Sequence, residues 1–159
     1  MLIMGIDPGN TGGISIVETK IDALPKIAYS LKMPVIQLYG KKIIDSQKIY
    51  NALSHFDIDV TIMEKVHAMP KQGVTSSFQF GRGFGGIEAL CYICSNRVDY
   101  VAPAVWKKHM GVGSSKKDSL DLARLKFGSL DIWMKKTNDG IAEASLLTLY
   151  WLDKFYQKK

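Results

Sequence analysis

The sequence lacks an apolar run long enough to cross a membrane, and it contains only two cysteines in 159 residues. A membrane-spanning helix needs roughly 20 apolar residues in succession, so we expect no membrane partner. The chain reaches Asp7 before any basic stretch, which argues against a secretory leader. We therefore expect a cytoplasmic protein.

The two cysteines, Cys91 and Cys94, have C-x-x-C spacing within an apolar stretch. A redox pair usually begins a helix, and a structural zinc ion needs two further ligands nearby. The surrounding sequence meets neither condition, so packing within a helix is the favoured interpretation.

Apolar residues make up 47% of the chain and charged residues 23%, a balance typical of globular proteins. No repeat, low-complexity stretch or linker divides the sequence. Domains commonly contain about 100–200 residues. We therefore predict a single domain over residues 1–159.

The net charge of +6 is unevenly distributed. Residues 65–117 carry eight basic side chains against two acids, whereas the segments on either side are close to neutral. Such a basic segment is typical of a surface that meets a polyanion such as DNA. An evenly solvated basic surface explains the charge equally well, so charge alone leaves both interpretations open.

Apolar periodicity and turn residues predict five strands and four helices. The expected strands are 2–6, 13–17, 26–33, 60–63 and 98–102. The expected helices are 46–56, 76–94, 115–127 and 137–155. Asp45 is expected to cap the first helix, and a capping box of Ser115 and Asp118 the third. This order predicts an α/β fold with a mixed five-stranded sheet, three antiparallel strands followed by parallel ones, flanked by helices.

The second expected helix carries Gly81 and Gly85 four residues apart, so one face lacks side chains. Another helix or backbone segment can approach such a face closely. Phe78, Phe80 and Phe84 are interpreted as core or dimer-packing residues rather than as wedges between DNA bases.

Two acids follow apolar strands directly, Asp7 after the first and Glu64 after the fourth. If these strands are neighbours, the sheet aims both side chains at one point. Asp139 and Glu143 lie four apart on the last helix and share a face. Together the four would form an oxygen-ligand site for a hard cation such as Mg²⁺. Each also has a structural explanation, such as a turn at Asp7 or a helix-dipole contact at Asp139.

Five short segments follow one another in a characteristic order. They are IDPGNTGG (6–13), MEKVH (63–67), SFQFGRGFG (77–85), GVGSSKK (111–117) and DGIAEA (139–144). In this order they resemble the motifs of the RuvC family of Holliday-junction resolvases, from residue 3 to about 150. The variants EKVH and DGIAEA are most similar to resolvases carried by bacterial viruses, which act in the cytoplasm of the bacterial host.

The resemblance implies an RNase H-like fold, a homodimer, and nicking of two symmetric strands at a four-way DNA junction with two Mg²⁺ or Mn²⁺ ions per site. It implies that Asp7, Glu64, Asp139 and Glu143 are the catalytic, metal-binding acids. The last motif of cellular members usually pairs an acid or histidine with an aspartate three residues on. Because Gly140 occupies the earlier position here, either Asp139 reaches the metal from one residue before it or only three acids bind metal.

The resemblance also assigns a catalytic role to Lys117, at the start of the third expected helix, where backbone N–H groups could also meet a phosphate. Six further side chains are expected to contact DNA: Lys65, His67, Arg82, Lys107, Lys108 and Lys116. A solvated face is the ordinary alternative for each of them.

Other functions remain open. One is a relaxed nuclease that cuts flaps, forks and Y-shaped DNA; another is a non-catalytic junction-binding protein, which the acids at two strand ends disfavour. The segment 7–13 also resembles the phosphate loop of actin-like kinases. Those enzymes place two domains around a nucleotide, for which 159 residues are too few, so we expect no nucleotide cofactor.

Overall fold

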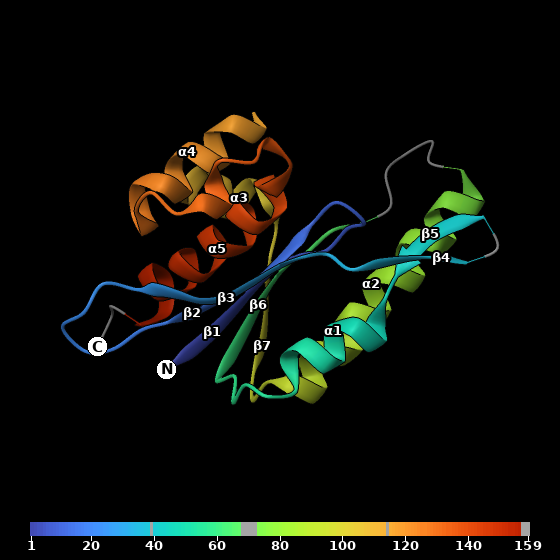
Figure 1. Ribbon diagram of the computed structural model, residues 1–159, viewed down its shortest axis with the longest axis horizontal. Helices are drawn as coiled ribbons and strands as arrows, with labels where there is room; N and C mark the ends of the chain where they lie inside the picture. The colour runs from blue at the N-terminus through green and yellow to red at the C-terminus, as the bar shows by residue number, and fades with distance from the viewer. Residues whose placement is uncertain (39, 68–72, 114, 157–159) are drawn as a thin grey trace.

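The computed structural model describes residues 1–38, 40–67, 73–113 and 115–156. A five-stranded sheet in the order β3-β2-β1-β6-β7 forms its centre (Figure 1). The strands are β1 (Leu2–Asp7), β2 (Gly13–Glu18), β3 (Lys26–Lys32), β6 (Val60–Glu64) and β7 (Val98–Val101). β1, β2 and β3 pair antiparallel, whereas β6 pairs parallel with both β1 and β7. The predicted mixed sheet is confirmed.

Helices cover both faces of this sheet (Figure 1). One face carries α3 (Pro103–Met110), α4 (Lys116–Phe127) and α5 (Asp139–Trp151), and the other carries α1 (Ser46–Leu53) and α2 (Val74–Cys94). The side chains of β1 alternate between the two apolar cores, because Ile3 packs with the α5 layer and Met4 with the α1–α2 layer. No helix among the described residues has the length and apolar character needed to span a membrane.

Glycines bring α5 against β1 and β2. A Cβ atom at Gly5 would overlap the carbonyl oxygen of Ala144, and one at Gly140 would lie 2.6 Å from the Cα of Gly12. In the same interface Ser145 Oγ donates a hydrogen bond of 2.8 Å to Ser15 Oγ. Direct backbone contact therefore sets the position of α5 relative to the sheet.

Two features of the structure were not predicted. The first is a hairpin of β4 (Val35–Leu38) and β5 (Lys41–Ile44), which forms a separate two-stranded sheet and contacts α2. Strands of four residues are too short to show a clear alternation. The second is α3, which begins at Pro103, ends at Met110 and is followed by Gly111, where φ is 69°. Proline at the first position and glycine just after the end are recognised helix signals, but a helix of eight residues offers little periodicity to support them.

Other element boundaries differ by a few residues. α1 ends at Leu53 rather than at 56, and α5 ends at Trp151 and continues as a π-helical turn, Leu152–Tyr156. The predicted caps are present: Asp45 accepts a hydrogen bond from the backbone of Lys48, and Ser115 and Asp118 form the capping box.

The face of α2 that carries Gly81 and Gly85 is free of contacts within the described chain, so a close approach by a second helix stays a prediction. Within the part of the chain that the structure describes, no atom lies within 4 Å of a Cβ built at Gly81 or Gly85, so this face is open. The close contacts occur instead at Gly83, near Ile44, and at Gly86, near Ser46. Cys91, at the far end of α2, is a free cysteine buried in the core, as its apolar surroundings predicted.

Candidate metal centre

Three carboxylates from three elements converge at one edge of the sheet. Asp7 is the last residue of β1, Glu64 is the last residue of β6, and Glu143 lies one turn into α5. One oxygen from each lies within 4.8 Å of those from the other two. Parallel pairing of β1 with β6 brings the two strand ends together, and the glycine contacts hold α5 above them.

Burial and the neighbouring negative charges disfavour the ionised forms of Asp7 and Glu64. Burial, followed by the charges of Glu64 and Glu143, raises the pKa of Asp7 from 3.8 to about 7. Burial and the charge of Glu143 raise the pKa of Glu64 from 4.5 to about 6. Lys107 opposes both shifts but does not cancel them. Carboxylates held in this unfavourable state are suited to bind a cation.

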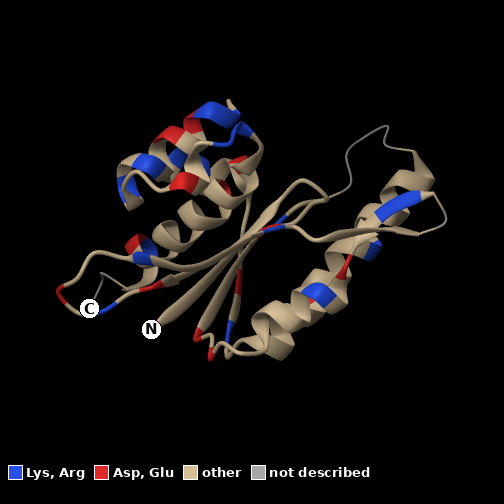
Figure 2. Cartoon of the chain, viewed as in Figure 1, with Lys and Arg blue, Asp and Glu red and all other residues tan. Residues whose placement is uncertain are grey.

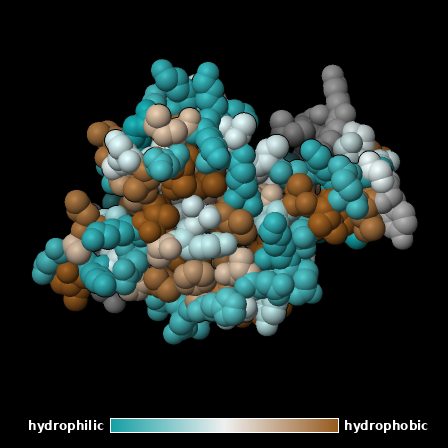
Figure 3. Space-filling model, viewed as in Figure 1, coloured by the Kyte–Doolittle hydropathy of each residue, from teal (hydrophilic) through white to brown (hydrophobic). Residues whose placement is uncertain are grey.

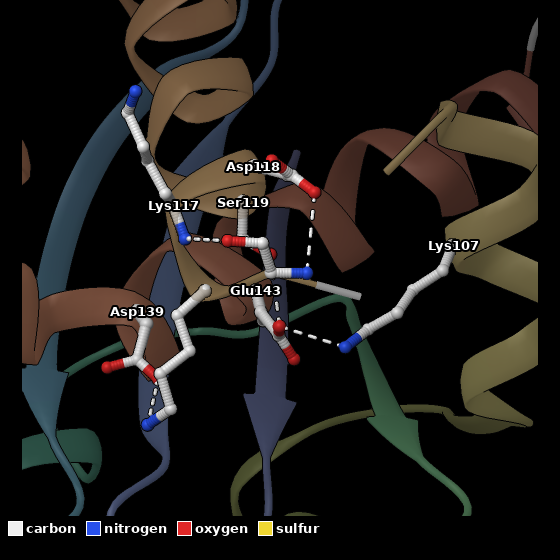
Figure 4. Close-up of polar contacts among 8 residues, drawn as sticks. Lys107, Lys117, Asp118, Ser119, Asp139 and Glu143 are labelled. Carbon is white, nitrogen blue, oxygen red and sulfur yellow. Dashed lines mark hydrogen bonds and ion pairs between the residues drawn. The ribbon is translucent and has the colours of Figure 1, made fainter. Parts of the chain in front are cut away.

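Glu143 is held by two side chains from neighbouring helices (Figure 4). Lys107 Nζ, in the last turn of α3, lies 2.9 Å from Glu143 Oε1, and Ser119 Oγ of α4 donates to the same oxygen at 3.0 Å. Neither contact was anticipated, since Lys107 was expected to meet DNA and nothing in the sequence distinguishes Ser119. The two contacts orient the carboxylate toward the other acids.

The residues present fit a divalent metal ion. Carboxylate oxygens are the ligands that Mg²⁺ and Mn²⁺ prefer, and a cation would relieve the repulsion among the three acids. The buried indole Nε1–H of Trp106 has no well-aligned acceptor among the described residues. It lies near Glu64 and lowers the pKa of that carboxyl, so it favours the charged form that a metal ion needs.

Asp139 lies beside the three acids but outside their cluster. Its side chain is 15% exposed, and its Oδ2 lies 2.8 Å from Lys116 Nζ, which raises the pKa of that lysine. The charge of Asp139 makes only the last of the contributions that raise the pKa of Asp7. Of the two possibilities left by the sequence, the geometry favours three acids, and a metal-binding role for Asp139 stays a prediction.

The remaining predicted residues are mostly exposed. Lys117 Nζ lies 3.9 Å from Asp121, and its side chain extends away from Glu143 (Figure 4). Arg82 lines a cavity between α2 and the hairpin. The side chains of three others face solvent: Lys65, His67 and Lys108. The expected catalytic role of Lys117 and the expected DNA contacts therefore stay predictions.

A basic groove of about 570 Å³ adjoins the acids next to Asp139. Lys116 lines it together with Lys32, at the end of β3, and Lys136, just before α5. Lys32 Nζ donates a hydrogen bond of 2.7 Å to Thr137 Oγ1 across the groove. Sequence reasoning missed Lys32 and Lys136, because only the fold brings these distant segments together. Figure 2 shows further basic positions on α4 and α2.

Comparison with known proteins identifies the architecture. No family model and no curated protein matches the sequence. The structure resembles Thermus thermophilus RuvC in complex with a Holliday junction substrate, with a TM-score of 0.70 and 14% identity over 98% of this chain and 97% of that one. The fold is that of RuvC. The RuvC-like fold also resembles that of the Fowlpox virus resolvase in complex with Holliday junction DNA, with a TM-score of 0.57 and 20% identity over 96% and 99% of the two chains.

Proposed function

We propose that the chain is a single nuclease domain that resolves four-way DNA junctions by metal-dependent nicking. The observation that carries this proposal is the convergence of Asp7, Glu64 and Glu143 at one edge of a RuvC-like sheet. Two structures with this fold are complexes with Holliday junction DNA, and the basic groove beside the acids offers a path for a DNA backbone. Such an enzyme belongs to DNA recombination and repair.

Each residue of the site has a distinct task. Asp7 and Glu64, held by the sheet, would bind Mg²⁺ or Mn²⁺ together with Glu143. When bound, one or two such ions activate water and stabilise the leaving oxygen in phosphodiester hydrolysis. Lys107 and Ser119 orient Glu143, and the positive charge of Lys107 keeps more of the acids ionised.

A panel of branched substrates tests the proposal. The protein is incubated with a synthetic four-way junction, a flap, a fork, a Y-structure and a linear duplex, with EDTA, Mg²⁺ or Mn²⁺, and the nicks are mapped on each strand. Symmetric paired nicks in the junction alone, dependent on metal, are the expected result. Equal cutting of flaps and forks would indicate a relaxed nuclease. Junction binding without any nick would indicate a non-catalytic protein.

Two lysines can be compared for their catalytic contribution. We expect Lys107→Met to lower the nicking rate roughly 10–100-fold, the usual effect of losing a group that orients a metal ligand. The acid limb of its pH–rate profile is expected to move to higher pH, because Lys107 lowers the pKa of Asp7 and Glu64. Lys117→Met, which removes a side chain that points away from the acids, should change the rate less. A larger loss in Lys117→Met would support the family-derived assignment instead.

The basic groove is expected to bind the DNA backbone. In B-DNA each phosphate contact contributes about 0.9 to the slope of log affinity against log salt concentration. Replacing Lys32 and Lys136 by alanine should therefore reduce the slope for junction binding in EDTA by nearly two. The control is Lys26→Ala, an exposed lysine at the opposite end of β3. An unchanged slope in the double variant would place the DNA elsewhere.

We also propose that α2 forms a homodimer through its open face. Phe78, Gly81, Gly85, Ala89 and Tyr92 recur every three or four residues and are all exposed. Phe78 is 66% exposed and Tyr92 is 61% exposed, although both are large aromatic side chains. The glycines between them allow a second helix to approach closely.

Gly85→Glu tests this dimer. We expect sedimentation velocity to find a dimer for the unmodified chain and a monomer for the variant, because a carboxylate would be buried at the helix contact. The helix itself should persist, since glutamate has a higher helix propensity than glycine. Asn51→Glu, on the exposed surface of α1, is the control. A Gly85→Glu protein that remains dimeric would rule out this face.

A further inference from the structure

A second cavity lies between the hairpin, α2 and the β1–β2 turn. Its volume is about 290 Å³, near the lower limit of roughly 300 Å³ for pockets that hold small ligands. The turn contributes Pro8, Gly9 and Asn10, and the hairpin contributes residues 42–44. The proposed nicking reaction does not use this cavity, although its wall begins at Pro8, one residue after Asp7.

The cavity wall combines three kinds of group. Phe80 and Phe84 contribute aromatic rings, and both are only partly buried. Gln79 contributes a buried Oε1 atom that accepts no hydrogen bond from any described residue. Lys42 and Arg82 are exposed cations that also line the cavity. Rings that stack on a base, an amide that binds its edge and cations that meet its phosphate are the features by which proteins hold single nucleotides.

A nucleotide bound in this cavity would lie close to a phosphate that is cleaved at the acids. Asn10 is three positions after Asp7 in the chain, which places their Cα atoms at most about 11 Å apart. Successive nucleotides of a duplex strand lie about 3.4 Å apart along the axis, so the mouth of the cavity is within roughly three nucleotides of a phosphate at the acids. Asn10 also lines the basic groove, so a strand bound in the groove reaches this cavity.

A hydrogen bond connects the hairpin to this turn. Asn10 Nδ2 donates to the carbonyl oxygen of Lys42 at 3.3 Å. Close packing also joins the hairpin to α2, since a Cβ at Gly83 would lie 3.1 Å from the Ile44 side chain. The hairpin thus closes one side of the cavity. Apolar and hydrophilic side chains are both exposed on the surface in the region of the hairpin (Figure 3).

We propose that this cavity receives an unpaired base of the DNA strand beside the cut, and that Gln79 determines which base is preferred. The inference rests on the proposed nuclease function. Bases at the crossover of a branched DNA leave the stack more easily than bases inside a duplex. A glutamine amide offers the donor and acceptor pair that matches the edge of adenine, so adenine is the base we expect.

Base preference measured in single-turnover nicking tests this proposal. Junctions that carry each of the four bases at each of three positions on either side of the cut are compared. We expect the unmodified protein to prefer one base at one position by about tenfold, within the range of a good glutamine–base contact. Gln79→Ala should lose this preference, whereas Gln47→Ala, an exposed glutamine on α1, should retain it. A preference that survives in Gln79→Ala overturns the proposal, as does the lack of any preference in the unmodified protein.

Removing the base provides a second readout. An abasic nucleotide at the preferred position should slow the unmodified protein to the rate of Gln79→Ala and leave Gln79→Ala unaffected. Additive losses from the two changes would overturn the proposal.

The absence of nicking in any junction would contradict the proposed nuclease function. A binding measurement tests the base site independently of that outcome. With Asp7→Asn bound to junctions that carry 2-aminopurine at successive positions, one position should change fluorescence, and Phe80→Leu should reverse that change. A uniform signal along the strand would overturn the proposal.

Discussion

Asp7→Asn is expected to abolish junction nicking and, at the same time, to stabilise the metal-free protein. The loss of one of the three converging acids that we propose as metal ligands should lower the nicking rate by at least about 1,000-fold. Binding of the junction should persist, because the basic groove is unchanged. Gel-based nicking and binding assays measure the two effects separately. A nicking rate within tenfold of the unmodified protein would remove Asp7 from the catalytic centre.

The gain in stability follows from the sign of the pKa shifts. Because the folded pKa of Asp7 is about 7 and that of Glu64 about 6, the folded chain binds protons more strongly than the unfolded chain above about pH 4. The free energy of unfolding therefore falls as the pH rises from about 4 to 7.

The rise in the pKa of Asp7 from 3.8 to about 7 lowers the free energy of unfolding at high pH by at most about 4 kcal/mol. Asparagine at this position should recover much of that loss at pH 8 and flatten the pH dependence, as urea denaturation in EDTA would reveal. Adding Mg²⁺ should stabilise the unmodified protein at the same pH. Asp57→Asn, an exposed residue before the start of β6, is the control and should change neither property. Equal pH dependence in Asp7→Asn and the unmodified protein would contradict this account.

Gly5→Ala is expected to produce the largest loss of stability. The new methyl group would overlap the carbonyl oxygen of Ala144, so α5 would have to move away from β1. Overpacking a rigid contact costs about 3 kcal/mol or more, which lowers the melting temperature of a chain of this size by roughly 10 °C. Thermal and urea unfolding measure the loss.

The matched control for this change is Gly9→Ala. Gly9 lies in the β1–β2 turn, and a Cβ atom there meets nothing within 4 Å. Its replacement should change the free energy of unfolding by less than about 1 kcal/mol. Similar losses in both variants would show that the turn, and not the contact with α5, limits stability.

The acids at the strand ends were the most predictable part of the site. An apolar run that ends in an acid predicts both a buried strand and the edge at which the side chain lies, as Asp7 and Glu64 illustrate. Glu143 was predictable from its motif. The order of strands and helices likewise sufficed for the mixed sheet.

The parts that escaped prediction depend on contacts between distant segments. Lys107 reaches Glu143 from α3, a helix of only eight residues whose signals were a proline and a glycine. Lys32 and Lys136 share a groove although 104 positions separate them. The open face of α2 was suggested by its glycine spacing, but which glycines meet the hairpin depends on how that hairpin folds.

The contact between the start of β2 and the start of α5 restricts which residues this chain accepts at two positions. A side chain at position 140 collides with the backbone of Gly12, and one at position 13 collides with the backbone of Gly140 and Ile141, so neither glycine can be replaced while α5 keeps its place. An acid cannot be added at position 140 by a single substitution, and Asp139 is the nearest position before it at which a carboxylate is tolerated. The tight packing that positions α5 therefore also restricts the substitutions by which the proposed set of metal ligands can be altered.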